Sequence, residues 1–158
     1  MTIYLGADHG GLKLKNQVIV WLKEWGYEFE DMGPFVYDAE DDYPDFAIPA
    51  SEKVGIDDDS DKDWKDRRKG ILVCRSAGGV IFAACKVKNI RAVAVSDELS
   101  AKHARLHNDA NIIALSGDWT SEEDAKKIVK VWLETEFSRD ERHVRRINKI
   151  KAYESLGE

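Results

Sequence analysis

Short strand-like runs alternate with longer amphipathic segments along most of the chain, and this alternation restricts the fold more than any other feature. Several of the runs are unbroken and apolar, which is typical of parallel strands that helices cover on both faces. Strands are predicted at residues 2–7, 27–33, 71–73, 90–95 and 111–115. We therefore predict an α/β fold, a three-layer α/β/α, Rossmann-like sandwich around a five-stranded parallel sheet.

The segments between these strands have apolar residues at helical spacing. In the first of them, residues 10–26, Leu14, Val18 and Leu22 recur on one face, and Gly26 suits the helix end. Further helices are predicted at residues 45–54, 80–87, 97–108, 120–137 and 139–155. The last of these carries Ile147 toward a core or a partner.

The length of the chain favours one domain. A chain of 158 residues can bury a substantial core but is too short for two domains of the usual size. We predict a single domain over residues 1–158, with a C-terminal helix at 139–155. The most polar stretch, residues 56–69, is interpreted as an acidic surface insertion, with a short helix near Trp64.

The composition limits the partners and the compartment. A formal net charge of -6 argues against nucleic acid and anionic membranes as partners, because both bind mainly through basic patches. No apolar run approaches the roughly 20 residues of a membrane helix, and the first residues lack a secretory signal, so we expect a cytoplasmic protein. Cys74 and Cys85 are too few for a disulfide framework and lack zinc spacing, so reduced thiols are expected.

The loop after the first predicted strand contains candidate chemistry. Open parallel sheets bind ligands beyond the carboxyl ends of their strands, where this chain places Asp8, His9, Gly10 and Gly11. An imidazole beside backbone N–H groups at a helix start can bind an anion. An N-cap aspartate beside an ordinary surface histidine gives the same pattern. No further ligand lies at a recognisable spacing, so metal binding is the weaker interpretation.

Cys74 ends the third predicted strand, directly before small residues. A thiol close to a helix start has a lowered pKa, and the small residues let backbone N–H groups approach a ligand. The alternative is a buried cysteine that only packs. Packing is also our interpretation of Cys85, inside the following helix.

Two histidine-containing segments remain. His107 and Asn108 lie at a predicted helix end. They could contribute to a site, either among the strand-end loops or near a neighbouring subunit. The alternative is that they form only a capped helix terminus. His103, one turn earlier, is expected on the surface. In the last helix, Arg142 and Arg146 share a face and could bind phosphate with bidentate hydrogen bonds, or they form a solvated basic stripe.

Taken together, the segments "GADHGG", "DYPDFA", "ILVCRSAGGVIFAACKVKNIRAV", "LHNDANI" and "ERHVRRI" resemble the family of type B ribose-5-phosphate isomerases and galactose-6-phosphate isomerases. Their order and spacing cover nearly the whole chain outside the acidic insertion. The resemblance implies an aldose-ketose isomerase of sugar phosphates that uses no metal and no organic cofactor. It also implies a homodimer or tetramer with an active site shared between chains.

The resemblance assigns a role to each candidate residue. Cys74 would move a proton between C1 and C2 through a cis-enediol, since family members without this cysteine use a glutamate where this chain has Val80. Ser76 and His107 would open the furanose ring. The residues that would contact the sugar hydroxyls, the phosphate or the enediolate are Asp8, His9, Tyr43, Ala77, Gly78, Gly79, Asn108, Arg142, His143 and Arg146.

Two departures from the family pattern bear on the substrate. Arg75 and Ala77 replace glycines of the usual loop, and Asp118 stands where many members have a phosphate-binding arginine. One hypothesis is that Arg75 replaces the lost positive charge. The alternatives are an isomerase of a hexose or an unphosphorylated sugar, a sugar-phosphate-binding module without catalysis, and a protein-contact role for the acidic insertion.

Overall fold

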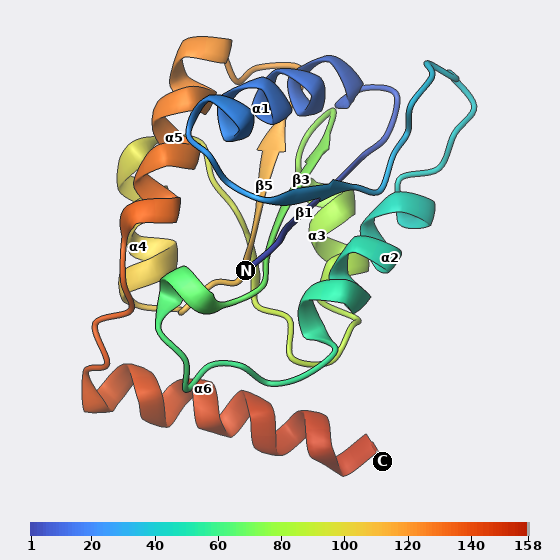
Figure 1. Cartoon of the computed structure of the whole chain (residues 1–158). Coiled ribbons are helices and arrows are strands. Elements are labelled where there is room, and N and C mark those ends of the chain that lie inside the picture. The colour runs from blue at the N-terminus through green and yellow to red at the C-terminus, as the bar shows by residue number, and fades with distance from the viewer. Residues whose placement is uncertain (158) are drawn as a thin grey trace.

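A five-stranded parallel sheet runs through the centre of the molecule (Figure 1). The computed structural model describes residues 1–157. The strands are β1 (Ile3–Ala7), β2 (Phe29–Asp31), β3 (Lys69–Cys74), β4 (Ala92–Ala94) and β5 (Ile112–Ser116). Their order in the sheet is β2-β1-β3-β5-β4, and every neighbouring pair is parallel. The predicted three-layer, Rossmann-like α/β fold is confirmed.

Helices cover both faces of this sheet (Figure 1). They are α1 (Leu12–Glu24), α2 (Pro44–Gly55), α3 (Gly78–Ala84), α4 (Glu98–Leu106), α5 (Glu122–Glu134) and α6 (Glu141–Glu154). Buried residues of α1, α4 and α5 form one core, and those of α2 and α3 form a second core on the other face. Within residues 1–157, no helix is long and apolar enough to cross a membrane.

Strand β3 shows why the central strands are apolar without interruption. Ile71 and Val73 belong to the core under α1 and α5, whereas Leu72 and Cys74 belong to the core under α2 and α3. Successive side chains of a strand point to opposite faces, so each of these four residues contacts one core or the other. The Cys74 side chain therefore lies on the α2 and α3 face, at the carboxyl end of the sheet.

The helix termini largely follow the sequence signals. Gly26 has a φ of +75° just after α1, in the left-handed region that glycine adopts without strain. The Ser121 hydroxyl accepts a hydrogen bond from the Asp124 N–H and caps α5. Helix α2 begins at Pro44, which needs no N–H partner there, while Pro49 lies inside the helix.

Helix α6 crosses the end of the molecule that lies away from the carboxyl ends of the strands, and in Figure 1 it runs below their amino ends. The Lys151 ammonium lies 2.7 Å from a carboxylate oxygen of Asp58, which ties this helix to the acidic segment. Ile147 is buried, but Ile150 and Tyr153 are mostly exposed. These exposed apolar side chains leave a surface on the helix for contact with a partner, which is the second role that we predicted for it.

The interpretation of residues 56–69 as a surface insertion is wrong for the second half of the segment. Trp64 is 2% exposed and Arg67 is 1% exposed, and the Trp64 ring packs edge-on against Trp132 at 5.2 Å. The Arg67 guanidinium makes two hydrogen bonds to Asp109, at 2.7 and 3.0 Å. Charged residues are buried here because this ion pair satisfies them, a long-range pairing that local polarity does not reveal.

Candidate active site

The loop after β1 lies directly against the loop after β3. The Asp8 carboxylate, which is buried, accepts a hydrogen bond of 3.1 Å from the Gly11 N–H. A Cβ atom on Gly11 would lie 2.2 Å from the Val73 carbonyl oxygen. Only glycine permits this approach, and it brings Asp8 and His9 beside the end of β3 that carries Cys74.

His9 is held by an aspartate from a distant loop. Both its backbone N–H and its ring Nδ1 lie within hydrogen-bond distance of one carboxylate oxygen of Asp41, at 3.0 and 2.7 Å. The Tyr37 ring stands edge-on to the imidazole at 5.9 Å. The hydrogen bond to Asp41 raises the pKa of His9; burial opposes this, and the nearby Asp8 carboxylate adds to it.

Cys74 is the last residue of β3, and its side chain is buried in the core that α2 and α3 cover. The residue is 4% exposed and belongs to the same core as Ala77, Val80 and the partly buried Tyr43. A Cβ atom on Gly79 would lie 2.8 Å from the Tyr43 ring. Tyr43 therefore lies against the first turn of α3 and packs against the same core as Cys74.

The segment from Arg75 to Gly79, which joins β3 to the first turn of α3, has an unusual backbone. Ala77 has a φ of +66°, a left-handed conformation that favours glycine. The Ser76 hydroxyl is exposed and accepts a hydrogen bond of 3.4 Å from the Gly78 N–H. Several backbone N–H groups therefore begin α3 close to Cys74, an arrangement that can stabilise a developing oxyanion.

Arg75 turns back over the loop after β1. A Cβ atom on Gly10 would lie 2.3 Å from the Arg75 Cγ, and the Arg75 charge acts to lower the pKa of His9. The Arg75 carbonyl accepts hydrogen bonds from the Ser116 hydroxyl and, at 3.2 Å, from the Asp118 N–H. The arginine side chain thus brings a positive charge to the His9 region.

The remaining predicted residues lie at the other end of the sheet. His107 ends α4, and its ring lies between those of His103 and His143, with ring centres 4.6 and 4.7 Å apart. Burial lowers the pKa of His143, and the charges of Arg142 and His107 add to the effect. His103 is exposed as expected, although its stacking on His107 was not predicted.

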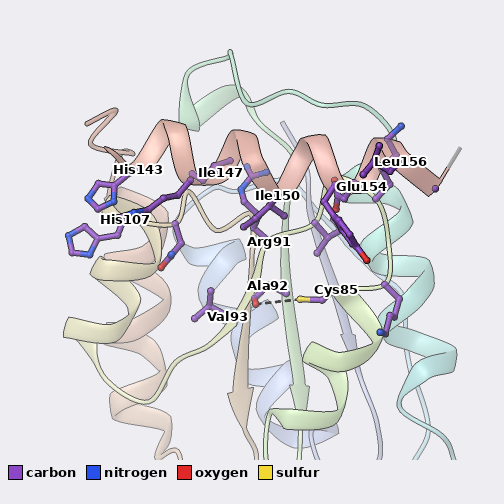
Figure 2. Close-up of a pocket in the computed structure, with 17 residues that line it drawn as sticks. Cys85, Arg91, Ala92, Val93, His107, His143, Ile147, Ile150, Glu154 and Leu156 are labelled. Carbon is purple, nitrogen blue, oxygen red and sulfur yellow. Dashed lines mark hydrogen bonds between the residues drawn. The ribbon is translucent and has the colours of Figure 1, made fainter. Parts of the chain in front are cut away.

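Figure 2 shows His107 and His143 at one end of an apolar groove between α6 and the edge of the sheet. The groove has a volume of about 980 Å³, and Asn108 and Arg146 also line it. Ile147, Ile150 and Leu156 form its apolar wall along α6 and the turn that follows.

The two groups of residues cannot meet on one small ligand within a single chain. His107 precedes β5, whereas Cys74 lies at the carboxyl end of the sheet, beside Ser116. The five residues of β5 span about 16 Å. A place for His107 among the strand-end loops is therefore excluded, while a place near a neighbouring subunit is compatible with the structure.

Sequence reasoning also missed or misplaced some residues. Asp41 was not a candidate, because it lies in an irregular loop 32 residues from His9 and only the fold joins them. Cys85 was interpreted as packing, but it is exposed and its thiol lies 3.7 Å from the Ala92 carbonyl oxygen. Cys85 is exposed because α3 ends at Ala84, so that Cys85 is the capping residue after the helix and does not face the core.

Asp8, His9 and Asp41 also have the donor types that could hold a divalent cation. One potential ligand atom from each lies within 4.8 Å of the others. In the structure, however, one Asp41 oxygen already pairs with the His9 ring. An ion pair therefore accounts for this cluster, and no step of chemistry is assigned to a metal.

Comparisons with known proteins agree with this arrangement. A model of the family described as Ribose/Galactose Isomerase matches residues 3–150. A crystal structure of ribose-5-phosphate isomerase B from Mycoplasma genitalium, with bound ribulose-5-phosphate, has a TM-score of 0.89 and 39% identity, covering 98% of this chain and 96% of that one. The ribose-5-phosphate isomerase B structure from Clostridium thermocellum has a TM-score of 0.87 and 36% identity, with full coverage of both chains.

A sequence comparison supports the same family assignment. Ribose-5-phosphate isomerase B of Mycobacterium tuberculosis is 37% identical over 158 residues, which are 100% of this chain and 93% of that protein. The match extends through the acidic segment and α6, beyond the sheet and its loops. The resemblance seen in the sequence is thereby confirmed, and the chain belongs to the ribose/galactose isomerase family.

Proposed function

We propose that this chain interconverts ribose-5-phosphate and ribulose-5-phosphate. The observation that carries the proposal is the position of Cys74, buried at the carboxyl end of β3 between the Asp8 loop and the Ser76 loop. The relative from Mycoplasma genitalium, which shares this fold, holds ribulose-5-phosphate. A buried thiol beside carboxylate, hydroxyl and backbone N–H groups suits proton transfer at a carbon next to a carbonyl.

The reaction needs the sugar in its open form. Ser76 and His107 would open the furanose ring by moving a proton from the anomeric hydroxyl to the ring oxygen. The Cys74 thiolate then takes the proton from C2, and the electron pair left behind forms a double bond between C1 and C2. Proton transfer to the C1 oxygen gives the cis-enediol. Return of the proton from the thiol to C1, with loss of the C2 hydroxyl proton, gives the ketose.

Charge develops on the C1 and C2 oxygens along this path. The N–H groups of Ala77, Gly78 and Gly79, together with the Asn108 side chain, would stabilise it. Asp8 and Tyr43 would orient the sugar hydroxyls. This assignment needs no metal and no organic cofactor.

The phosphate would lie among cations from both groups of residues. His9 and Arg75 approach it from the loops after β1 and β3, and Arg142 and Arg146 approach it from α6, with His143 adjacent. Arginine binds phosphate oxygens with paired hydrogen bonds. Since α6 lies at the far end of the same chain, the second set must come from another copy.

The assembly that follows is a homodimer, or a tetramer built from such dimers, with each site shared by two chains. The groove along α6 supports this proposal, because Tyr153 is 76% exposed and Leu156 is 81% exposed beside the buried Ile147. Apolar surface of this kind marks an interface, and we assign it to a second copy. A cytoplasmic location is part of the same proposal.

The direct test is the isomerisation of ribose-5-phosphate followed at neutral pH, with pentose and hexose phosphates and the free sugars in parallel. Cys74→Ala should abolish turnover and leave the circular dichroism spectrum unchanged. Cys85→Ala is the matched control, because it removes the other thiol. Substantial turnover by Cys74→Ala would contradict the assigned mechanism.

A second candidate function rests on Arg75, Ala77 and Asp118, where the chain departs from the family pattern. The site could act on a hexose or an unphosphorylated sugar, or bind a sugar phosphate without catalysis. Exchange of the C2 proton with deuterated solvent decides between catalysis and binding alone. Bound ribose-5-phosphate that keeps its C2 proton would favour the binding module.

A further inference from the structure

The side chain of Asp41, in the loop before α2, contacts His9, the proposed phosphate contact. Asp41 lies 32 residues from His9, and one of its carboxylate oxygens accepts a hydrogen bond of 3.0 Å from the His9 backbone N–H. The same oxygen lies 2.7 Å from the ring Nδ1. The Asp41 side chain is only 9% exposed, and its second oxygen is buried without a hydrogen-bond partner among residues 1–157.

This pairing fixes which ring nitrogen carries a proton. Nδ1 must hold a hydrogen in order to donate it to the carboxylate, so Nε2 is the nitrogen left for a ligand. A neutral ring would offer Nε2 as an acceptor, which repels a phosphate oxygen. An imidazolium offers Nε2–H as a donor, so His9 can bind phosphate only if it keeps both protons.

The groups around His9 act on its charge in opposite directions. Asp41 and Asp8 favour the cation, whereas Arg75 disfavours it. Arg75 lies over Gly10 and is itself a proposed phosphate contact, so its positive charge would tend to remove the proton from His9. The Asp41 carboxylate opposes this effect from the other side of the ring.

We propose that Asp41 is a positioning residue that holds His9 as an oriented imidazolium, so that His9 and Arg75 can bind one phosphate group together. This proposal rests on the proposed function of His9 as a phosphate contact. A purely structural link between the two loops would need only the backbone hydrogen bond, and it would leave the ring free to rotate. The second contact, to Nδ1, is the one that acts on the ring.

The neighbouring residue Asp38 provides a matched control. It lies in the same loop, is exposed, and accepts a hydrogen bond of 3.0 Å from the Glu40 N–H without contacting His9. Asparagine can replace either aspartate with the same shape and still accept a backbone hydrogen bond. Asp41→Asn therefore removes the charge and retains the link to the His9 backbone.

The experiment measures kcat and KM for ribose-5-phosphate between pH 5.5 and 8.5, and follows the His9 ring by NMR with and without inorganic phosphate. In Asp41→Asn, the titration midpoint of His9 should fall, because the carboxylate whose hydrogen bond raises the pKa of the ring loses its charge. KM should rise by up to about tenfold above that midpoint, in proportion to the lost imidazolium. It should return to the wild-type value at low pH, with kcat little changed throughout. Asp38→Asn should behave as the wild type does.

Three results would overturn the proposal. One is an unchanged His9 midpoint in Asp41→Asn, and another is a rise in KM that is the same at every pH, as a general loosening of the loop would give. The third is a zinc-induced shift of the His9 signals that depends on Asp41 and occurs at micromolar metal, which would make the cluster a cation site. If the wild type turns over no sugar, the proposed function fails, while the NMR titration with phosphate still tests Asp41.

Discussion

Replacing Asp109 by asparagine should destabilise the fold strongly, because its carboxylate is the ion-pair partner that three arginines share. Its oxygens accept hydrogen bonds of 2.7 and 3.0 Å from Arg67 and of 2.9 Å from Arg91. Arg105 Nη2 lies 3.0 Å from Oδ1 as an ion pair without hydrogen-bond geometry. The Asp109 side chain is 3% exposed, so solvent cannot replace it.

The magnitude follows from this burial. Removing one partner of a buried ion pair costs about 3 to 5 kcal/mol, because the other charges remain in the interior without compensation. For a chain of this size each kcal/mol lowers the melting temperature by about 2 to 4 °C, so Asp109→Asn should lose about 6 to 20 °C. The same substitution at Asp57, whose side chain is 75% exposed and pairs with Arg68 at 3.4 Å, should cost about 0 to 1 kcal/mol.

The assay is thermal and urea unfolding of both variants at pH 7 and one fixed chain concentration, because the proposed dimer would make melting temperatures depend on concentration. Burial raises the pKa of Asp109, but the hydrogen bond and charge of Arg67, with the other arginines, outweigh it and hold the pKa below its usual value. Its contribution is therefore complete above about pH 4 and is lost as the pH falls further. Equal stability losses in Asp109→Asn and Asp57→Asn would refute the reasoning.

Two further predictions concern single cations. Burial, and to a smaller extent the charge of Arg105, lowers the pKa of Lys69 to about 7, whereas an ordinary lysine has a pKa of 10.5. The unfolded chain therefore binds more protons between these values, so stability should rise from pH 7 to pH 10 by on the order of a few kcal/mol. Lys69→Met should flatten that rise in urea unfolding, and parallel pH profiles would contradict it. Arg75→Ala should raise KM more for phosphorylated than for unphosphorylated sugars in the isomerisation assay, and equal effects would show that Arg75 does not contact phosphate.

The fold could be predicted because its main signals are local. Runs such as Ile71 to Val73 are apolar at every position, since helices cover both faces of the sheet, and this pattern is visible without any long-range information. The predicted ends of elements are displaced by up to three residues, as for α3, which begins at Gly78 and ends at Ala84. Those ends depend on capping and on contacts with neighbouring loops.

The misread segment around Trp64 and the missed Asp41 share one physical cause, which is pairing between distant residues. The segment that contains Trp64 and Arg67 looks solvated until Asp109, 42 residues from Arg67, neutralises the guanidinium. Asp41 looks like one of several acidic residues in a loop until the fold brings it to His9. Cys74, by contrast, was a candidate from the start, because a strand end is a local feature that predicts a site.

The central claim is that Cys74 of one chain and His107 of another complete one isomerase site, and mixed dimers test it most directly. Cys74→Ala and His107→Ala should each be inactive alone. After equal amounts are unfolded and refolded together, about half of the dimers should be mixed, each with one intact site of two, so about one quarter of wild-type turnover should return. A mixture that stays as inactive as its components, although it forms mixed dimers, would contradict the shared site.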